Sequence, residues 1–502
     1  MRPLLDDGNV ALVRERAAYA KKSPYPPSEL FPEWPGSVLG DEDNPAYRAV
    51  RSALAALGMD KRNFNTPDWN PLHALVKPGD DVVLKPNFVS HRNLLHPVRG
   101  DTDCLITHGS VIRAALDYVA KALHGSGTIT IADCPIQSTD WDALLRVVGL
   151  PQIIADARER FPTLGFDVVD CRLAVAVVRS GGAVDRVQRR GVDATEVDLG
   201  PASLLVPITR HDVDFGVTHY GRRRMRGAHT PTRHAYLIGN RFLECDVLLN
   251  LPKLKSHQKA GITCALKNLV GINAHKDYLP HFRFGSPQTG GDEFSDGNWF
   301  WKLIWWMRHH EWEHERGIQK RLWALIAGGS KQLLPYLSGM PRAATSTGGG
   351  GWSGNDTLWR TVLDINRAFF YYDAASGTIG EAMNARRYLA IVDGLIGGDH
   401  ESPLFPSRVE SGLVLAGRNP MAVDFVASAC MGFDWERIPQ LARAVEPMRL
   451  PLASFGAADI RVHSAEGIRT LSEMDGGAFV AFVPSRGFLG HVEGEARLSA
   501  VV

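Results

Sequence analysis

The sequence lacks closely spaced cysteines, a net excess of one charge and any long uninterrupted apolar run. Its six cysteines stand singly and form no Cys-x-x-Cys pair, which argues against an iron–sulfur cluster and a structural zinc site. Their apolar neighbours are typical of reduced, buried thiols in a cytosolic protein. A net charge of +1 provides no global field for a polyanion, so we expect no nucleic-acid partner.

The sequence also gives no sign of a membrane-spanning segment. The longest apolar stretch, residues 412–433, is interrupted by Arg418, Asn419 and Asp424. Asp6 and Asp7 stand where a signal peptide would have apolar residues. With 502 residues, 44% of them hydrophobic and 22% charged, the chain can form two domains or one large α/β body with insertions. We therefore expect a cytoplasmic protein without a membrane span.

Alternating strand and helix patterns predict an α/β fold. A strand at 81–84, a helix at 110–123 and a strand at 128–133 form a βαβ unit, which favours a mostly parallel sheet with flanking helices. A further helix is expected at 358–371 after glycine-rich chain. Further strands are expected at 166–169, 204–208, 247–251, 388–392, 413–416 and 459–463.

These patterns divide the chain into five parts. Residues 1–78 are expected to form a helical extension, with helices at 11–22 and 44–58. The expected parts after it are a first core part (79–282), a helical insertion (283–347), a second core part (348–440) and an α/β tail (441–502). Tryptophans at near-helical spacing in 299–326 are typical of core or partner packing, so the insertion is a candidate lid or homo-oligomer interface.

Residues 248–281 place cations where a buried strand ends. If the chain stays extended after the strand, Lys253, Lys255 and His257 point to one face, about 6–7 Å apart at alternate positions. A helix expected at 260–269, capped at Gly271, brings Lys267 and Asn268 into its last turn. Crowded cations repel one another unless an anion or carboxylates lie among them. The alternative is a solvated basic turn, since lysine is usually exposed.

Other predicted strands also end in polar groups. Lys85 and Asn87 follow one strand, Asp133 ends the next, and Asp393 ends a later one before a loop containing Asp399. Ligands of open α/β sheets bind beyond the carboxyl ends of the strands. We therefore expect these groups to share one cleft, although loops are also polar simply for solubility.

Two short motifs match known signatures without their usual context. Residues 290–294 spell the Gly-Gly-Asp-Glu-Phe signature of diguanylate cyclases, but the flanking residues form no strand pair, so we interpret the match as coincidence. The segment from His310 to His314 fits the H-E-x-x-H zinc motif, with Glu311 as general base. In the extended form of that motif the third ligand position is Lys320, whose ammonium cannot coordinate zinc.

Two loops are candidate anion contacts. Glycines 348–351 precede the helix at 358–371, so the backbone at Gly350 and Gly351, together with Asn355, is a candidate anion cradle; the alternative is a flexible linker with an N-cap. The basic loop 221–227 is more typical of a solvated turn than of an anion clamp over the cleft.

Four motifs occur in order that together resemble one family. They are Lys85-Pro86-Asn87, the run from 249 to 271 with Lys-Leu-Lys-Ser-His and Leu-Lys-Asn-Leu-Val-Gly, Val392-Asp393-Gly394, and the segment 416–424. From about 82 to 432 the chain resembles the family catalogued as domain of unknown function 362. The resemblance implies a cytosolic α/β protein. Some relatives look associated with exopolysaccharide production, and others carry iron–sulfur cysteines that this chain lacks.

These features lead to three functional hypotheses. The first is an enzyme acting on a phosphorylated or carboxylated metabolite. The second is an accessory protein that binds a partner or polysaccharide through the tryptophan-rich insertion and the basic loop, and the third is a zinc protease that uses Glu311.

For the enzyme, the residues divide into three roles. The expected proton-transfer residues are Lys267, His257 and Lys255. The expected substrate contacts are Lys85, Asn87, Asp133, Lys253, Asn268, Gly350, Gly351 and Asn355. Weaker candidates for balancing charge or holding a divalent metal are Asp393, Asp399 and Asp424.

Overall fold

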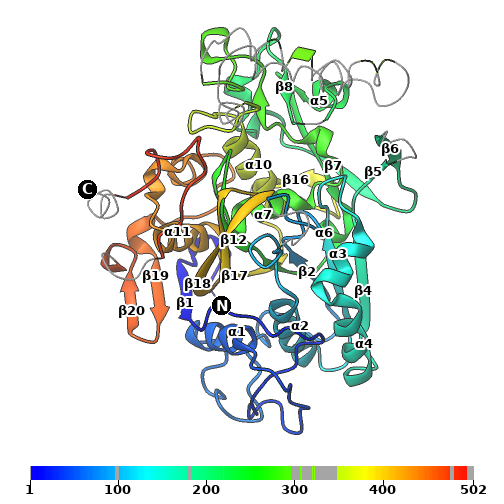
Figure 1. The fold of residues 1–502 in the computed structure, drawn as a ribbon, viewed down its shortest axis with the longest axis vertical. Helices are drawn as coiled ribbons and strands as arrows, with labels where there is room; N and C mark the ends of the chain where they lie inside the picture. The colour runs from blue at the N-terminus through cyan, green and yellow to red at the C-terminus, as the bar shows by residue number, and fades with distance from the viewer. Residues whose placement is uncertain are drawn as a thin grey trace.

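The computed structural model describes residues 2–95, 101–178, 184–218, 220–295, 348–474 and 480–494, with isolated positions at 303, 306, 307, 319 and 322. Most of the strands belong to an 11-stranded sheet in the order β20-β19-β1-β18-β17-β11-β2-β3-β4, with β12 and β13 joined to it beside β17 (Figure 1). The strands of this sheet are β1 (Asn9–Arg14), β2 (Asp81–Pro86), β3 (Thr128–Asp133), β4 (Gly165–Asp170), β11 (Val247–Leu251), β12 (Lys253–His257), β13 (Gly261–Thr263), β17 (Arg387–Glu401), β18 (Phe405–Gly417), β19 (Arg461–Ser464) and β20 (Gly467–Thr470).

The sheet is mixed, and its parallel half carries the predicted βαβ unit. Strands β4, β3, β2, β11 and β17 pair parallel to one another. Beyond them, β18 pairs antiparallel with both β17 and β1, and β19 pairs parallel with β1. The prediction of an α/β fold with a mostly parallel sheet and flanking helices is confirmed.

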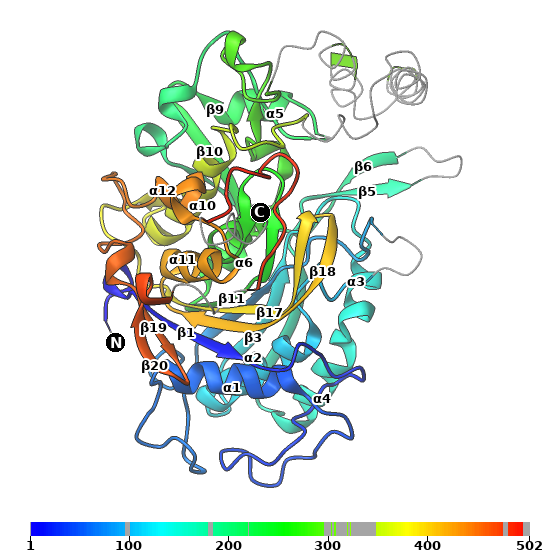
Figure 2. The same cartoon turned by 60° about the vertical axis from the view of Figure 1, so that its left-hand side comes forward.

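Two helical layers cover the two faces of the sheet (Figure 2). Alternation along β2 places Val82 and Leu84 in one core cluster and Val83 in the other, as the two-residue period of a strand requires. The first face is covered by α1 (Pro45–Ala56), α2 (Gly109–Leu123) and α4 (Leu150–Arg160). The second face is covered by α7 (Ala265–Asn268), α10 (Leu358–Tyr371) and α11 (Pro420–Cys430).

Smaller elements surround this body. Strands β17 and β18 form a long hairpin whose pairing shifts between Gly394 and Ile396, and the ribbon curves strongly in Figure 2. The smaller sheets are β5 (Ala174–Val178) with β6 (Val184–Gln188), β7 (Ala194–Asp198) with β10 (Arg233–Gly239) and β9 (His229–Thr230), β8 (Phe215–Gly216) with β14 (Phe282–Arg283), and β15 (Tyr372–Asp373) with β16 (Thr378–Ile379). The remaining helices are α3 (Trp141–Val148), α5 (Arg223–Ala228), α6 (Asn240–Glu244) and α12 (Pro439–Ala442).

Three of the predicted elements are wrong. The expected helix at 11–22 is instead the strand β1, because pairing with β18 and β19 outweighs local helical spacing. The expected strand at 204–208 is a 3-10 turn over Val206–Ile208, where Pro207 has no N–H for a sheet. The expected helix at 260–269 is split into β13, the short α7 and a 3-10 turn over Leu269–Ile272.

The tryptophan-rich insertion, including the H-E-x-x-H segment, lies almost entirely outside the described residues, so its prediction stays open. In the described part of the chain, none of the helices has the length and apolar character needed to cross a membrane.

Candidate functional site

A cavity of about 620 Å³ opens at the carboxyl ends of β2 and β3, beside β12 and α7. The tip of the β17–β18 hairpin and the β5–β6 hairpin contribute to its walls through Leu404, Phe405, Ala176 and Arg186. The basic side chains that line the cavity are Lys85, Arg186, Lys255, His257, Lys259, Lys267, Lys276 and His281. Among the described lining residues the one carboxylate is Asp133. The cavity therefore has a strong excess of positive charge.

Lys85 and Asp133 form the ion pair at the base of the cavity. The Lys85 ammonium lies 2.8 Å from Asp133 Oδ1, and both side chains are buried. Asp133 also accepts hydrogen bonds from the backbone N–H groups of Phe88 and Cys134. A Cβ at Gly271 would lie 2.6 Å from both charged groups of this pair, so the turn after α7 packs closely against it.

Two asparagines link this pair to α7. Asn268 Oδ1 accepts a hydrogen bond from Asn87 Nδ2 at 2.9 Å and a longer one from the Lys85 ammonium at 3.4 Å. The Asn268 amide donates to Asn250 Oδ1 on β11 at 2.7 Å. The predicted contacts Lys85, Asn87, Asp133 and Asn268 are thus brought together in one network.

Lys255 lies in the wall of the cavity and pairs with no carboxylate of the described residues. Its side chain is fully buried, and the ammonium donates to the backbone oxygen of Leu105 at 2.6 Å. Burial, with the nearby charges of Lys253 and Lys267, lowers the pKa of Lys255 to about 7.

Lys267 projects from α7, whose first turn is held by Asp424. Asp424 accepts hydrogen bonds from the backbone N–H groups of Ala265 and Leu266. Within the described part of the chain, the Lys267 amine has no hydrogen bond or ion pair. Burial, followed by the charges of Lys276, Lys259 and Lys85, lowers the pKa of Lys267 to about 7.

The two cavity histidines have opposite hydrogen-bond orientations. His257 Nδ1 lies 3.0 and 3.1 Å from the backbone N–H groups of Lys259 and Ala260, so the neutral ring carries its proton on Nε2. His281 Nδ1 faces the Leu279 oxygen at 2.8 Å, which assigns the proton to Nδ1 and leaves Nε2 as an acceptor. Burial lowers the pKa of both rings well below the usual range, with additional effects of Lys267 and Lys259.

Further polar groups complete the lining. Lys259 donates to Thr218 Oγ1 at 2.8 Å, and burial lowers its pKa to about 8. Lys276 donates to the Cys134 oxygen at 2.8 Å. Gln137 Nε2 and Asn87 Oδ1 are buried and have no hydrogen-bond partner among the described residues, so each has unused capacity for a ligand.

Lys253, a predicted substrate contact, lies outside the cavity lining. Its ammonium is 2.9 Å from Asp393 Oδ2 and donates to the Tyr19 hydroxyl at 2.8 Å. Asp393 also accepts from the Tyr19 hydroxyl and from the backbone N–H of His108. Both charged side chains are fully buried, so this ion pair joins β12 to β17 within the protein.

The glycine-rich segment also lies outside the cavity lining. Asn355 Oδ1 accepts from the backbone N–H groups at the start of α10, while its amide donates to the oxygens of Gly350 and His281. The neighbouring Gly351 packs against Gly487. The structure therefore uses Gly350, Gly351 and Asn355 to cap α10 and to fix the chain next to His281.

The three weaker metal candidates lie in separate networks. Asp393 pairs with Lys253, and Asp424 holds the start of α7. Asp399 pairs with His400 and accepts from the Val483 N–H. Within the described part of the chain, no group of three or more His, Cys, Asp or Glu side chains is arranged to hold a metal ion.

The basic loop and the 290–294 motif have structural partners. Arg226 and Arg222 pair with Asp214, and Arg224 pairs with Asp277. Asp292, in the 290–294 motif, accepts from the Thr357 hydroxyl at 2.6 Å and the Asp356 N–H, which joins that motif to the start of α10.

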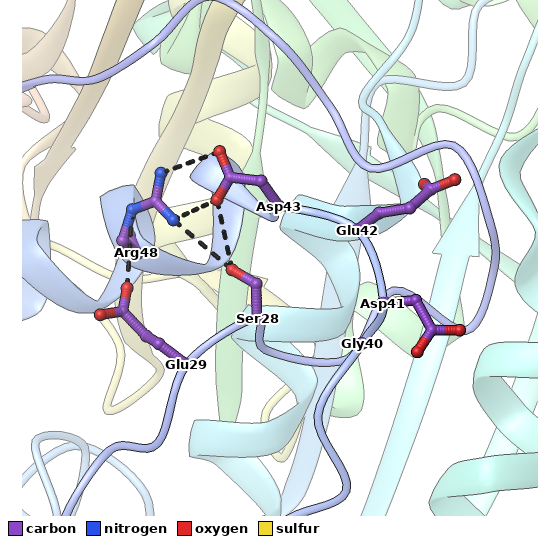
Figure 3. A pocket seen from close by; sticks show the side chains of 7 residues that line it. All are labelled: Ser28, Glu29, Gly40, Asp41, Glu42, Asp43 and Arg48. Carbon is purple, nitrogen blue, oxygen red and sulfur yellow. Dashed lines mark hydrogen bonds and ion pairs between the residues drawn. The ribbon is translucent and has the colours of Figure 1, made fainter.

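A second depression is acidic and differs in character. Figure 3 shows it between the chain around Ser28 and the segment 40–43, with Arg48 pointing toward Asp43 and Glu29. Arg48 forms ion pairs with both of these carboxylates. Glu42 accepts hydrogen bonds from the backbone N–H groups of Lys21 and Lys22. The linings of this depression and of the cationic cavity have no residue in common among the described residues.

Sequence reasoning missed four basic residues among those that line the cavity in the described chain. Lys259, Lys276 and His281 lie inside the segment 248–281, which the sequence analysis already singled out for its charges. The number of basic residues in that short segment was the signal that could have identified them. Arg186 comes from the β5–β6 hairpin, and no local pattern links it to this segment.

Comparison with known proteins gives a family match without a function. Residues 207–429 match the family described as "Domain of unknown function (DUF362)", so the resemblance expected from the sequence is confirmed over that region. Comparison with curated proteins finds no match.

Comparison with solved structures adds no functional information. A crystal structure of a Thermotoga maritima protein from the Northeast Structural Genomics Consortium shares 11% identity, with a TM-score of 0.30. The likeness covers 78% of this chain, and the chain spans 60% of that protein. At this TM-score the likeness determines neither fold nor function.

The buried Lys253–Asp393 pair yields a stability prediction. Asp393→Ala leaves an uncompensated buried ammonium and is expected to lower the free energy of unfolding by about 3–5 kcal/mol. The double variant Lys253→Met/Asp393→Leu removes both charges and is expected to lie closer to the wild type. Urea unfolding measures both effects, and an Asp393→Ala variant as stable as the wild type would contradict this role.

The lowered pKa of Lys267 gives a pH-dependent stability prediction. The Lys267 side chain is half-buried. The folded protein releases its proton near pH 7, whereas the unfolded chain keeps it until about pH 10.5. The unfavourable free energy of this charge in the folded state is therefore full below pH 7 and disappears as the pH rises to 10.5. Lys267→Met is therefore expected to melt about 2 °C or more above the wild type at pH 7, with the difference shrinking toward pH 10.

The melting temperatures of the wild type and of Lys267→Met are compared at each pH, so that the contributions of other titrating groups cancel. These include the buried thiols, whose pKa values burial raises, and Asp424, whose pKa burial raises to about 7. If the difference in melting temperature between Lys267→Met and the wild type stays constant from pH 7 to 10, the pKa of Lys267 is not lowered.

Proposed function

Starting from a family match that names no activity, we propose that this protein is an enzyme that acts on an anionic metabolite, phosphorylated or carboxylated, by acid–base chemistry of lysine and histidine. One observation carries the proposal. Five lysines and Arg186 line the same cavity, which has Asp133 as its one carboxylate among the described lining residues.

Electrostatics favours an anion in this cavity. Ammonium groups removed from bulk water and placed near one another are stabilised either by losing protons or by gaining a negative partner. Asp133 is already engaged by Lys85 and by two backbone N–H groups, so it offers little compensation to Lys259, Lys267 and Lys276. A bound phosphate or carboxylate would supply the missing negative charge and accept their hydrogen bonds.

The same cavity supports proton transfer. Lys255 and Lys267, with pKa values of about 7, are present in both protonation states at neutral pH, which is the condition for an efficient general acid or base. His257 presents an Nε2–H donor, and His281 presents an Nε2 acceptor. We assign Lys267 and Lys255 as the acid–base residues, with His257 as a hydrogen-bond donor to the substrate.

The remaining groups would hold and orient the substrate. Lys85 and Lys276 provide charge, and Asn87 and Gln137 provide the unused amide atoms described above. Divalent-metal assistance stays a proposal, with Asp133 as the one cavity carboxylate that could serve as a protein ligand.

The cavity charge predicts specific stabilisation by small anions. Sulfate, which stays doubly charged from pH 6 to 10, is expected to raise the melting temperature of the wild type by about 2 °C or more at saturation, through mass action on the folded state. Phosphate, pyrophosphate and citrate are tested alongside it by differential scanning fluorimetry. Lys267→Met is expected to lose most of this shift.

Lys61→Met provides the matched control, because Lys61 is exposed and lies outside the cavity. The rise in melting temperature that each anion causes should be the same in Lys61→Met as in the wild type. If Lys267→Met and Lys61→Met respond to every anion as the wild type does, the stabilisation is a general salt effect and the proposed anion site is wrong.

A further inference from the structure

The five cavity lysines differ in what their amines contact. Lys85 is paired with Asp133, and Lys255 donates to the Leu105 oxygen. Lys259 donates to the Thr218 hydroxyl, and Lys276 donates to the Cys134 oxygen. Within the described chain, the Lys267 amine alone of the five has neither a hydrogen bond nor an ion pair.

Lys267 lines the cavity together with Lys255, His257 and His281. Burial lowers the pKa values of these three groups, and the charge of Lys267 lowers them further. Its own pKa is lowered in turn by Lys276, Lys259 and Lys85. Basic groups from β2, β12 and the chain after α7 thus surround one amine that faces the cavity.

These surroundings favour a neutral, nucleophilic amine at Lys267. A lysine is a nucleophile only when neutral, and desolvation beside other cations is the known physical means of neutralising it at physiological pH. Each of the four other amines already donates one hydrogen bond to an oxygen atom of the protein, which holds its nitrogen in place and leaves further protons for a ligand. Within the described chain the Lys267 nitrogen has no such contact, so its lone pair, when the amine is neutral, is available to a ligand in the cavity.

We propose that Lys267 forms an imine with the carbonyl carbon of an anionic aldehyde or ketone held in this cavity. The inference rests on the proposed anion-binding function and narrows its substrate class to anions that carry a carbonyl group. The surrounding lysines bind the phosphate or carboxylate of the substrate, while Lys267 reacts with its carbonyl.

The chemical step balances with groups already in the cavity. The neutral Lys267 nitrogen attacks the carbonyl carbon, a C–N bond forms, and the carbonyl electron pair moves to oxygen. A proton moves from nitrogen to that oxygen and gives a carbinolamine. The Lys255 ammonium then protonates the hydroxyl, the C–O bond breaks, and water leaves as the protonated imine forms. Hydrolysis reverses these steps and restores both lysines.

Reductive trapping tests this inference on the full chain. The protein is incubated with pyruvate, glyoxylate or glyceraldehyde 3-phosphate, reduced with sodium borohydride and examined by intact mass and peptide mapping. We expect a single secondary-amine adduct at Lys267, formed roughly tenfold more than at any exposed lysine. Acetone, a neutral carbonyl compound, should give little adduct.

Two variants complete the experiment. Lys267→Arg keeps the positive charge but lacks a nucleophilic amine, so it should lose the adduct and keep its sulfate-dependent rise in melting temperature. Lys61→Arg, altered at an exposed site, should label as the wild type does.

The outcomes separate the imine from the anion site. Absence of an adduct in a wild-type protein that sulfate still stabilises overturns the imine and leaves the anion site in place. Absence of both the adduct and the sulfate effect overturns the proposed function itself. Labelling spread evenly over exposed lysines, or retained in Lys267→Arg, also overturns the inference.

Discussion

Mutual repulsion among desolvated lysines is the constraint on which the site depends. Lys255, Lys259, Lys267 and Lys276 are held around one cavity, and Lys85 pairs with Asp133, the one carboxylate among the described lining residues. Such an arrangement costs folding free energy, so the surrounding structure has to hold it in place. Asp424 does this for Lys267 by binding the first turn of α7, a helix only four residues long. On the proposed function, this loss of stability is the cost of a cavity that can bind an anion.

The sheet determines which cations reach the cavity. Lys85 lies on the same face of β2 as Val83, under α7, whereas its neighbour Leu84 faces the opposite helical layer. Along β12 the pairing with β17 shifts between Lys253 and Lys255. On one side of this irregularity Lys253 meets Asp393, and on the other side Lys255 lines the cavity. Two residues apart on one strand, Lys253 is thus paired with a carboxylate, whereas Lys255 remains in the lining of the cavity.

The parallel strands could be predicted from the sequence, because each is a short apolar run between turn signals. The grouping of Lys85, Asn87, Asp133 and Lys255 followed from the rule that strand ends share an edge. Lys267 was predicted from its place in the last turn of the helix expected at 260–269, and the cavity contains all five residues. Lys253 instead pairs with the buried Asp393 of β17, a long-range contact that its own segment of sequence does not indicate. The strand β1 was misread as a helix because its partners β18 and β19 lie about 400 residues away in the sequence.

The measurement that tests the central claim most directly is the pKa of the Lys267 amine itself. Competitive labelling of lysines with a trace amine reagent across pH 6–11, read by peptide mass, reports it alongside the exposed Lys61. The account predicts that Lys267 titrates near pH 7, well below the ordinary lysine value of 10.5, and shifts upward when sulfate is added. A Lys267 that titrates together with Lys61, with or without sulfate, would contradict it.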